Sequence, residues 1–147
     1  IAKAPENPPI RVVLAAGLCS MFFALMFGGS LQEAAASCII GMLLRLGLTR
    51  LERLPLSGFT VMFAAGIIIA VLCEIAVLIS VIPSSAVTMT AVLMQVVPGL
   101  AIVNAIRDLI AGDLVSGVAR ATEAFMTAAG LSIGAAAGMM LVSAGIT

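Results

Sequence analysis

The sequence predicts an all-α integral membrane protein with five transmembrane helices, the fourth of them broken. Hydrophobic residues make up 63% of the 147 residues and charged residues 10%, with a mean hydropathy of +1.29. Such a chain has too little polar surface to cover a water-facing globule. Its apolar residues gather into five runs that each approach the ~20 residues needed to cross a bilayer. This composition argues against the soluble enzyme classes.

Turn-forming or charged segments separate the five apolar runs, which cover residues 10–27, 31–48, 58–82, 85–103 and 117–142. The first three separators contain Gly28 and Gly29, a charged stretch at 49–55, and Pro83, and in each of them hydrophobicity is lost beside turn formers. Residues 1–9 form a polar, proline-rich cytoplasmic leader ahead of a membrane domain at 10–147. Because the chain begins with Ile1 rather than Met, we expect an N-terminal portion to be missing.

The basic residues predict the orientation of the chain, because Lys and Arg are retained on the cytoplasmic side of a membrane. The connections at Gly28 and Pro83 contain neither. All seven basic residues lie toward the other ends of the runs: Lys3, Arg11, Arg45, Arg50, Arg53, Arg107 and Arg120. We therefore expect a multi-pass protein of the cell (inner) membrane with a cytoplasmic N-terminus and an external C-terminus.

The remaining composition limits the chemistry. Seven Lys and Arg balance seven Asp and Glu, so there is no basic field to bind nucleic acid. The chain has no His, and Cys19, Cys38 and Cys73 are widely spaced within apolar runs, where we interpret them as packing residues. We expect no metal site, no cofactor and no enzymatic activity.

The fourth run is predicted to break at Pro98 and Gly99. Proline lacks the amide hydrogen that a helix needs, and glycine tolerates unusual dihedral angles. Thr88, Gln95 and Gly99 share one helical face that leads to this break. A broken span with a polar face suits a ligand site, and a kink that only aids packing is the alternative.

A compact polar cluster follows the break. Asn104, Arg107 and Asp108 fall within one helical turn, so their side chains can converge. Gly112 and Asp113 end that short helix. Asp108 is a candidate proton acceptor and Arg107 a candidate partner for a substrate carboxylate. The alternative is an ordinary salt bridge in a cytoplasmic loop.

The fifth run carries one stripe of polar residues followed by glycines, namely Ser116, Arg120, Glu123, Thr127, Gly130, Gly134 and Gly138. At about 100° per residue the stripe stays within about 40° of one line. It is expected to face other helices, since small residues let backbones approach and intramembrane charges avoid lipid. The glycines favour helix packing, whereas Arg120 and Glu123 could form an ion pair, a gate or both.

Glu74 is the only carboxylate deep within an apolar run. A charged side chain facing lipid is costly, so Glu74 is expected to face the protein interior, to be paired or to be protonated. Proton coupling through Glu74 and a neutral acid that serves only packing remain equal alternatives.

The segment VPGLAIVNAIRDLIAGDLVSGVARATEA, residues 97–124, resembles the threonine/serine exporter family, and FGGSLQEA, residues 27–34, fits the same family. The resemblance extends across all five runs and implies a bacterial or fungal membrane protein that expels threonine, serine or small dicarboxylates. Such proteins combine two five-span units, fused or separate, and this chain resembles the first. At matching motif positions the resemblance marks these residues without assigning roles: Pro98, Gly99, Asn104, Arg107, Asp108, Gly112, Asp113, Arg120 and Glu123.

Two hypotheses follow. The first is proton-coupled export by alternating access, in which a second five-helix unit completes an inverted repeat around a central pathway. Its candidate substrate-binding or proton-coupling residues are Glu74, Gln95, Pro98, Gly99, Asn104, Arg107, Asp108, Gly112, Asp113, Arg120 and Glu123. In it the arginines meet a substrate carboxylate, the amides bind amino-acid polar groups, and one of the acids carries protons. The second is a non-transporting assembly or scaffold subunit whose glycine stripe binds a partner helix.

Overall fold

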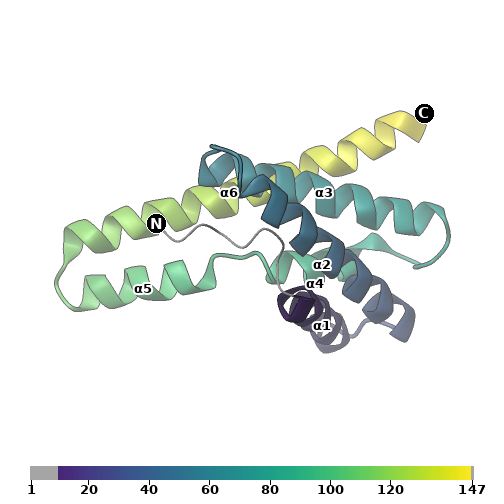
Figure 1. Cartoon of the computed structure of the whole chain (residues 1–147), viewed down its shortest axis with the longest axis horizontal. Helices are drawn as coiled ribbons and strands as arrows, with labels where there is room; N and C mark the ends of the chain where they lie inside the picture. The colour runs from purple at the N-terminus through teal and green to yellow at the C-terminus, as the bar shows by residue number, and fades with distance from the viewer. Residues whose placement is uncertain (1–9, 147) are drawn as a thin grey trace.

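The computed structural model describes residues 10–146, which form six α-helices and, within that range, no β-strand (Figure 1). The helices are α1 (Ile10–Met26), α2 (Leu31–Leu51), α3 (Gly58–Leu78), α4 (Ser85–Met94), α5 (Gly99–Ile110) and α6 (Leu114–Ile146). The predicted all-α class is confirmed. The predicted leader, residues 1–9, lies outside the described residues.

Several of the helices are long and apolar enough to cross a membrane. α2, α3 and α6 each meet this requirement, and α4 and α5 meet it together as a pair bent by 50°. α1 is a shorter apolar helix of 17 residues. Length and composition therefore give three or four candidate spans in a multi-pass membrane protein, and the count of five and the inverted repeat remain predictions.

Several helix ends differ from the ends of the predicted runs. The fourth run is given as ending at residue 103, whereas α5 ends at Ile110, and the second as ending at 48, whereas α2 ends at Leu51. The third run was expected to continue to residue 82, but α3 ends at Leu78 because Ser80 adopts a positive φ of 56° and the Val81 amide turns back to bond the Ala76 carbonyl at 3.0 Å. The fifth run was expected to begin at residue 117, whereas α6 begins at Leu114.

The turn between α1 and α2 reverses the chain sharply. Gly28 has a φ of +78°, and the Gly29 amide donates to the Ala24 carbonyl at 2.9 Å, so the last carbonyls of α1 are satisfied. Ser30 then caps α2: its hydroxyl accepts from the Glu33 amide, and the Glu33 carboxylate accepts from the Ser30 amide at 2.8 Å. Glu33 thus has a structural role at this turn.

The core forms where α4 contacts α1, α2 and α3. Leu44, Ile69 and Val92, from α2, α3 and α4, are fully buried there. A smaller cluster of alanines, Ala24, Ala34 and Ala91, lies where α1, α2 and α4 meet. Small residues at such points let helix backbones approach closely, which is the main source of packing energy in a membrane.

α3 and α6 pack along a seam of glycines. A Cβ added to Gly130 would lie 2.9 Å from the Phe59 carbonyl, and one added to Gly138 would lie 2.7 Å from the Ala70 Cβ. Gly134 lies between them against Phe63. Because the paired residue numbers rise together, the two helices are parallel. The interpretation of the glycine stripe as a packing surface is therefore confirmed.

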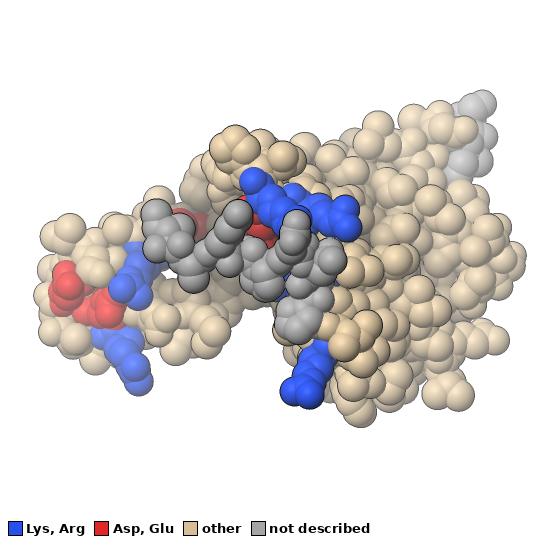
Figure 2. All heavy atoms as spheres, in the orientation of Figure 1, with Lys and Arg blue, Asp and Glu red and all other residues tan. Residues whose placement is uncertain are grey.

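α6 extends well past the beginning of α3. Gly58, the first residue of α3, lies beside Thr127, with 3.6 Å between a Cβ built on the glycine and the Thr127 Cγ2. Residues 114–126 of α6 therefore project about 20 Å beyond that end of α3. α5 packs against this projecting segment, and we call the two together the α5–α6 hairpin (Figure 1). Figure 2 shows charged side chains over the hairpin and the middle of the molecule and none on the right-hand part of the same face.

Candidate functional site

The fourth predicted span is broken as the sequence indicates. α4 ends at Met94 and α5 begins at Gly99, and the two helices meet at 50°. Pro98 precedes α5 with a ψ of 55° and makes no side-chain cap. Gly99 is not among the glycines of positive φ in the described residues, so its conformational freedom is not what causes the break. The break follows from Pro98, which has no amide hydrogen to continue the helix.

The turn at Gly112 and Asp113 closes the hairpin. Gly112 has a φ of +87°, and the Asp113 amide donates to the Asp108 carbonyl at 3.0 Å, which ends α5. The Asp113 carboxylate then accepts the Ser116 amide at 3.1 Å and caps α6. These two predicted site residues thus build the turn that places α5 and α6 side by side.

The turn brings Asp108 and Arg120 together across the hairpin. Arg120 Nε lies 3.1 Å from Asp108 Oδ2, and the Ser116 hydroxyl donates to the same oxygen at 3.2 Å. The Asp108 side chain is 25% exposed and that of Arg120 53%. Arg120 therefore pairs with Asp108, and the ion pair considered between Arg120 and Glu123 is not formed.

The remaining polar residues of the hairpin lie on different sides of its two helices. Asn104 lies four residues before Asp108 and Glu123 three residues after Arg120, so both share the side of the hairpin that holds the ion pair. We call this side the polar flank: Asn104, Asp108, Ser116, Arg120 and Glu123. Arg107 lies about 100° around α5 from Asp108, is exposed, and makes no ion pair within the described residues. The expected convergence of Arg107 with Asp108 does not occur.

Glu74 lies far from the polar flank. Its Oε1 accepts a hydrogen bond of 2.7 Å from the hydroxyl of Ser85, the first residue of α4. Glu74 follows Gly58 by 16 residues, which places it more than about 30 Å along the helix axes from Arg120. Glu74 is therefore hydrogen-bonded to a partner, and pairing is one of the three arrangements that the sequence predicts for it. No sequence pattern points to Ser85, because only the packing of α3 on α4 brings its hydroxyl to the Glu74 carboxylate.

Gln95 and Thr88 occupy the middle of the bundle. The Gln95 side-chain amide donates to the Gly41 carbonyl of α2 across 3.5 Å, the longest side-chain hydrogen bond described. Thr88 is fully buried, and its hydroxyl has no hydrogen-bond partner within the described residues. The predicted helical face through Thr88, Gln95 and Gly99 does not reach Gly99, because α4 ends at Met94 and Gly99 begins the next helix. The predicted site residues therefore lie in three separate polar regions rather than in one site. These regions are the polar flank, the Glu74–Ser85 hydrogen bond, and the region of Gln95 and Thr88.

Comparison with known proteins gives one family. Searches of curated proteins and of solved structures found no match. The family described as "Putative threonine/serine exporter", ThrE, matches residues 1–142 of the 147. The match covers all six helices except the last few residues of α6. The chain therefore belongs to the threonine/serine exporter family.

Proposed function

We propose that this chain is a subunit of a proton-coupled exporter of threonine, serine or related small carboxylates. It works by alternating access together with a second five-helix unit, in a cell (inner) membrane. The observation that carries the proposal is the break between α4 and α5, which leads to the Asp108–Arg120 ion pair on the polar flank. Broken helices that lead to charged residues are typical of transporter binding sites.

The polar flank offers the groups that a small zwitterion needs. The ammonium group requires an acceptor, which Asp108 and Glu123 supply, and the carboxylate requires a donor, which Arg120 supplies. Asn104 and the Ser116 hydroxyl can bind the hydroxyl group of threonine or serine. In the present arrangement Asp108 and Arg120 neutralise each other. Substrate binding would exchange this internal pair for contacts with the ligand.

The other two polar regions lie along the same proposed transport pathway. Gln95 lies at the break, and the Glu74–Ser85 hydrogen bond lies near the opposite end of α3. If the N-terminus is cytoplasmic, as the sequence predicts, the hairpin lies at the cytoplasmic end of the pathway and Glu74 lies near its external end. Asp108, Asp113 and Glu74 are the candidate proton carriers. Because the polar flank is partly exposed, the second unit is needed to complete the pathway.

Efflux measurements with Asp108→Asn test the proposal. Export of labelled threonine, serine and succinate is measured from membrane vesicles with and without a pH gradient, for the chain alone and with a candidate five-helix partner. Replacing Asp108 removes the proton site and the charged hydrogen bond to Arg120, so gradient-driven efflux should fall by about tenfold or more.

Thr122→Ala is the matched control, because Thr122 is exposed on the same helix and its hydroxyl bonds only the Val118 carbonyl of its own helix at 2.9 Å. The control should transport normally. Normal gradient-dependent efflux by an inserted and assembled Asp108→Asn protein would remove Asp108 from the mechanism.

A non-transporting assembly subunit is the alternative, and it rested on the glycine stripe of α6. Gly130, Gly134 and Gly138 pack against α3 of the same chain. Their spacing is thus accounted for by folding of this chain, which leaves the alternative without its motivating observation. The alternative would nevertheless be favoured if no combination of units showed flux despite correct insertion.

A further inference from the structure

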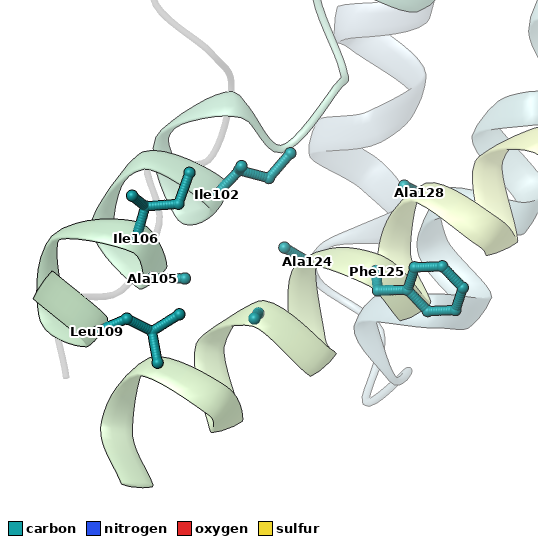
Figure 3. Close-up of a pocket in the computed structure, with 8 residues that line it drawn as sticks. Ile102, Ala105, Ile106, Leu109, Ala124, Phe125 and Ala128 are labelled. Atoms are coloured by element: carbon teal, nitrogen blue, oxygen red, sulfur yellow. The ribbon is translucent and has the colours of Figure 1, made fainter. Parts of the chain in front are cut away.

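Two further surfaces of the molecule differ in chemistry. A groove of about 240 Å³ between α5 and α6 is lined only by apolar side chains, among them Ile102, Leu109 and Phe125 (Figure 3). It offers a ligand no charged or hydrogen-bonding side chain. The other surface lies where α1 begins and α2 ends, and it carries positive charge. We call it the basic surface: Arg11, Arg45, Arg50 and Arg53.

Positive charge at the basic surface exceeds negative charge. Residues 45–53 contain three arginines and one acid, Glu52. Arg11 lies near the same level, because α1 and α2 are antiparallel and a Cβ built on Gly41 lies 3.2 Å from the Ala16 carbonyl, about one turn from the arginine on each helix. Among the described residues at this end of α1 and α2, four arginines therefore accompany one carboxylate. Figure 2 shows basic side chains over the middle of the molecule.

The basic surface lies where the chain meets the edge of the membrane. α2 and α3 are each long and apolar enough to span a bilayer, and a short connection, residues 52–57, joins them. A connection between two spanning helices lies at the boundary of lipid and water. In this connection Leu54 is 56% exposed and Leu56 42%. Apolar side chains beside arginines at this depth match the two parts of a phospholipid, its acyl chains and its phosphate.

The single carboxylate does not satisfy these arginines. Arg45 Nη1 lies 3.8 Å from Glu52 Oε1, which is longer than a hydrogen bond. The Nε–H of Arg45 is enclosed and has no acceptor within the described residues. Arg11 and Arg50 are exposed and form no ion pair among those residues. A phosphate accepts two hydrogen bonds from one guanidinium, so it suits these side chains better than the distant carboxylate of Glu52.

We propose that the basic surface binds the phosphate groups of anionic phospholipids in the adjoining leaflet. Arg45 and Arg50 donate hydrogen bonds to the phosphate, and Leu54 and Leu56 contact the acyl chains below it. Arg45 turns outward to do so, which gives its Nε–H an acceptor. Each arginine at a membrane surface strengthens binding to anionic lipid by about fivefold, which corresponds to about 1 kcal/mol. This binding goes beyond the proposed export function and does not depend on it.

A tryptophan reporter tests this binding, because the chain has no tryptophan or tyrosine of its own. Leu54→Trp places the only tryptophan of the full chain beside the basic surface. The protein is inserted in phosphatidylcholine vesicles that contain brominated phosphatidylcholine or brominated phosphatidylglycerol, and quenching gives the relative binding constant of each lipid. Phosphatidylglycerol should bind at least about fivefold more tightly than phosphatidylcholine.

Val81→Trp is the matched control for position. Val81 is 47% exposed in the connection at the other end of α3, and that connection contains no basic residue. A tryptophan at this position should show no preference for either lipid. Quenching by brominated phosphatidylcholine in each variant verifies that the protein is inserted.

Arg50→Gln in the Leu54→Trp protein tests the role of the arginine. The preference for phosphatidylglycerol should fall about fivefold, whereas Arg50→Lys, which keeps the positive charge, should retain most of it. Arg107→Gln removes the same charge from the hairpin and should leave the preference unchanged.

Four outcomes would overturn the proposal. The first two are equal binding of both lipids at Leu54→Trp and an equal preference at Val81→Trp. The third is a preference that Arg50→Gln leaves intact. The fourth is loss of the preference on addition of excess inorganic phosphate, which would assign the surface to a free phosphate rather than to a lipid.

Discussion

The buried hydroxyl groups of the bundle are satisfied to different degrees. Ser37 donates to the Glu33 carbonyl of its own helix at 2.7 Å, and Ser20 to the Ala16 carbonyl at 3.2 Å. The Thr88 hydroxyl is equally buried but has no partner within the described residues. An unsatisfied buried polar group costs about 1–3 kcal/mol. Thr88 therefore destabilises α4 in this conformation.

Thr88→Val tests the role of this hydroxyl. Valine has nearly the same shape and removes the unsatisfied group, so the free energy of unfolding should rise by about 1 kcal/mol. Thermal unfolding in detergent measures this change. Ser37→Ala is the comparison, because it removes a satisfied hydroxyl and should not stabilise the protein. If Thr88→Val is destabilised, the hydroxyl has a partner, such as a bound water.

At the scale of helices, local chemistry at the turns sets where each element ends. The turns at Gly28 and Gly112 use the same arrangement: a glycine of positive φ ends one helix, and a capping residue, Ser30 or Asp113, begins the next. Such turns are compact and place consecutive helices side by side. The position of Asp108 opposite Arg120 depends on the second of them.

Gly112→Ala should loosen the α5–α6 hairpin. A residue with a Cβ is strained by about 1–2 kcal/mol at the φ of +87° that Gly112 adopts, although an added Cβ would meet no atom within 4 Å. Hydrogen exchange of the amides at 109–117 should become faster. Gly99→Ala is the control, since Gly99 has no positive φ and is also surrounded by open space. Equal exchange in the two variants would contradict this account of the turn.

At the scale of the whole molecule, one seam joins the hairpin to the bundle. Among the described helices α6 contacts only α3 and α5. The bundle of α1 to α4 therefore holds α6 through the glycine seam on α3. Motion of the hairpin relative to the bundle would have to occur at this seam and at the break before α5.

Gly134→Ala should weaken the whole fold at that seam. An added Cβ would clash with the backbone carbonyl of Phe63, and overpacking of this kind costs about 1–3 kcal/mol. The melting temperature in detergent should fall. Gly47→Ala is the control, because a Cβ at Gly47 in α2 meets nothing within 4 Å and should leave the melting temperature unchanged or slightly raised. An unchanged melting temperature for Gly134→Ala would show that the helices can separate at little cost.

The sequence by itself determined the membrane class, the helical content, the break at Pro98 and the packing role of Gly134 and its neighbours. These features depend on local information: the lengths of apolar runs, residues that cannot continue a helix, and the spacing of small residues on one face. Runs 10–27 and 31–48 lie close to α1 and α2 for this reason.

The tertiary structure alone decided which polar groups meet. Asp108 pairs with Arg120 rather than approaching Arg107, and Glu74 meets Ser85, because helix register and crossing determine contacts between different helices. The same holds for the stripe on α6. Its polar half lies against α5 and its glycine half against α3, since α6 is longer than α3 and projects past it. Periodicity places residues on a common face, but only the packed neighbours decide what that face touches.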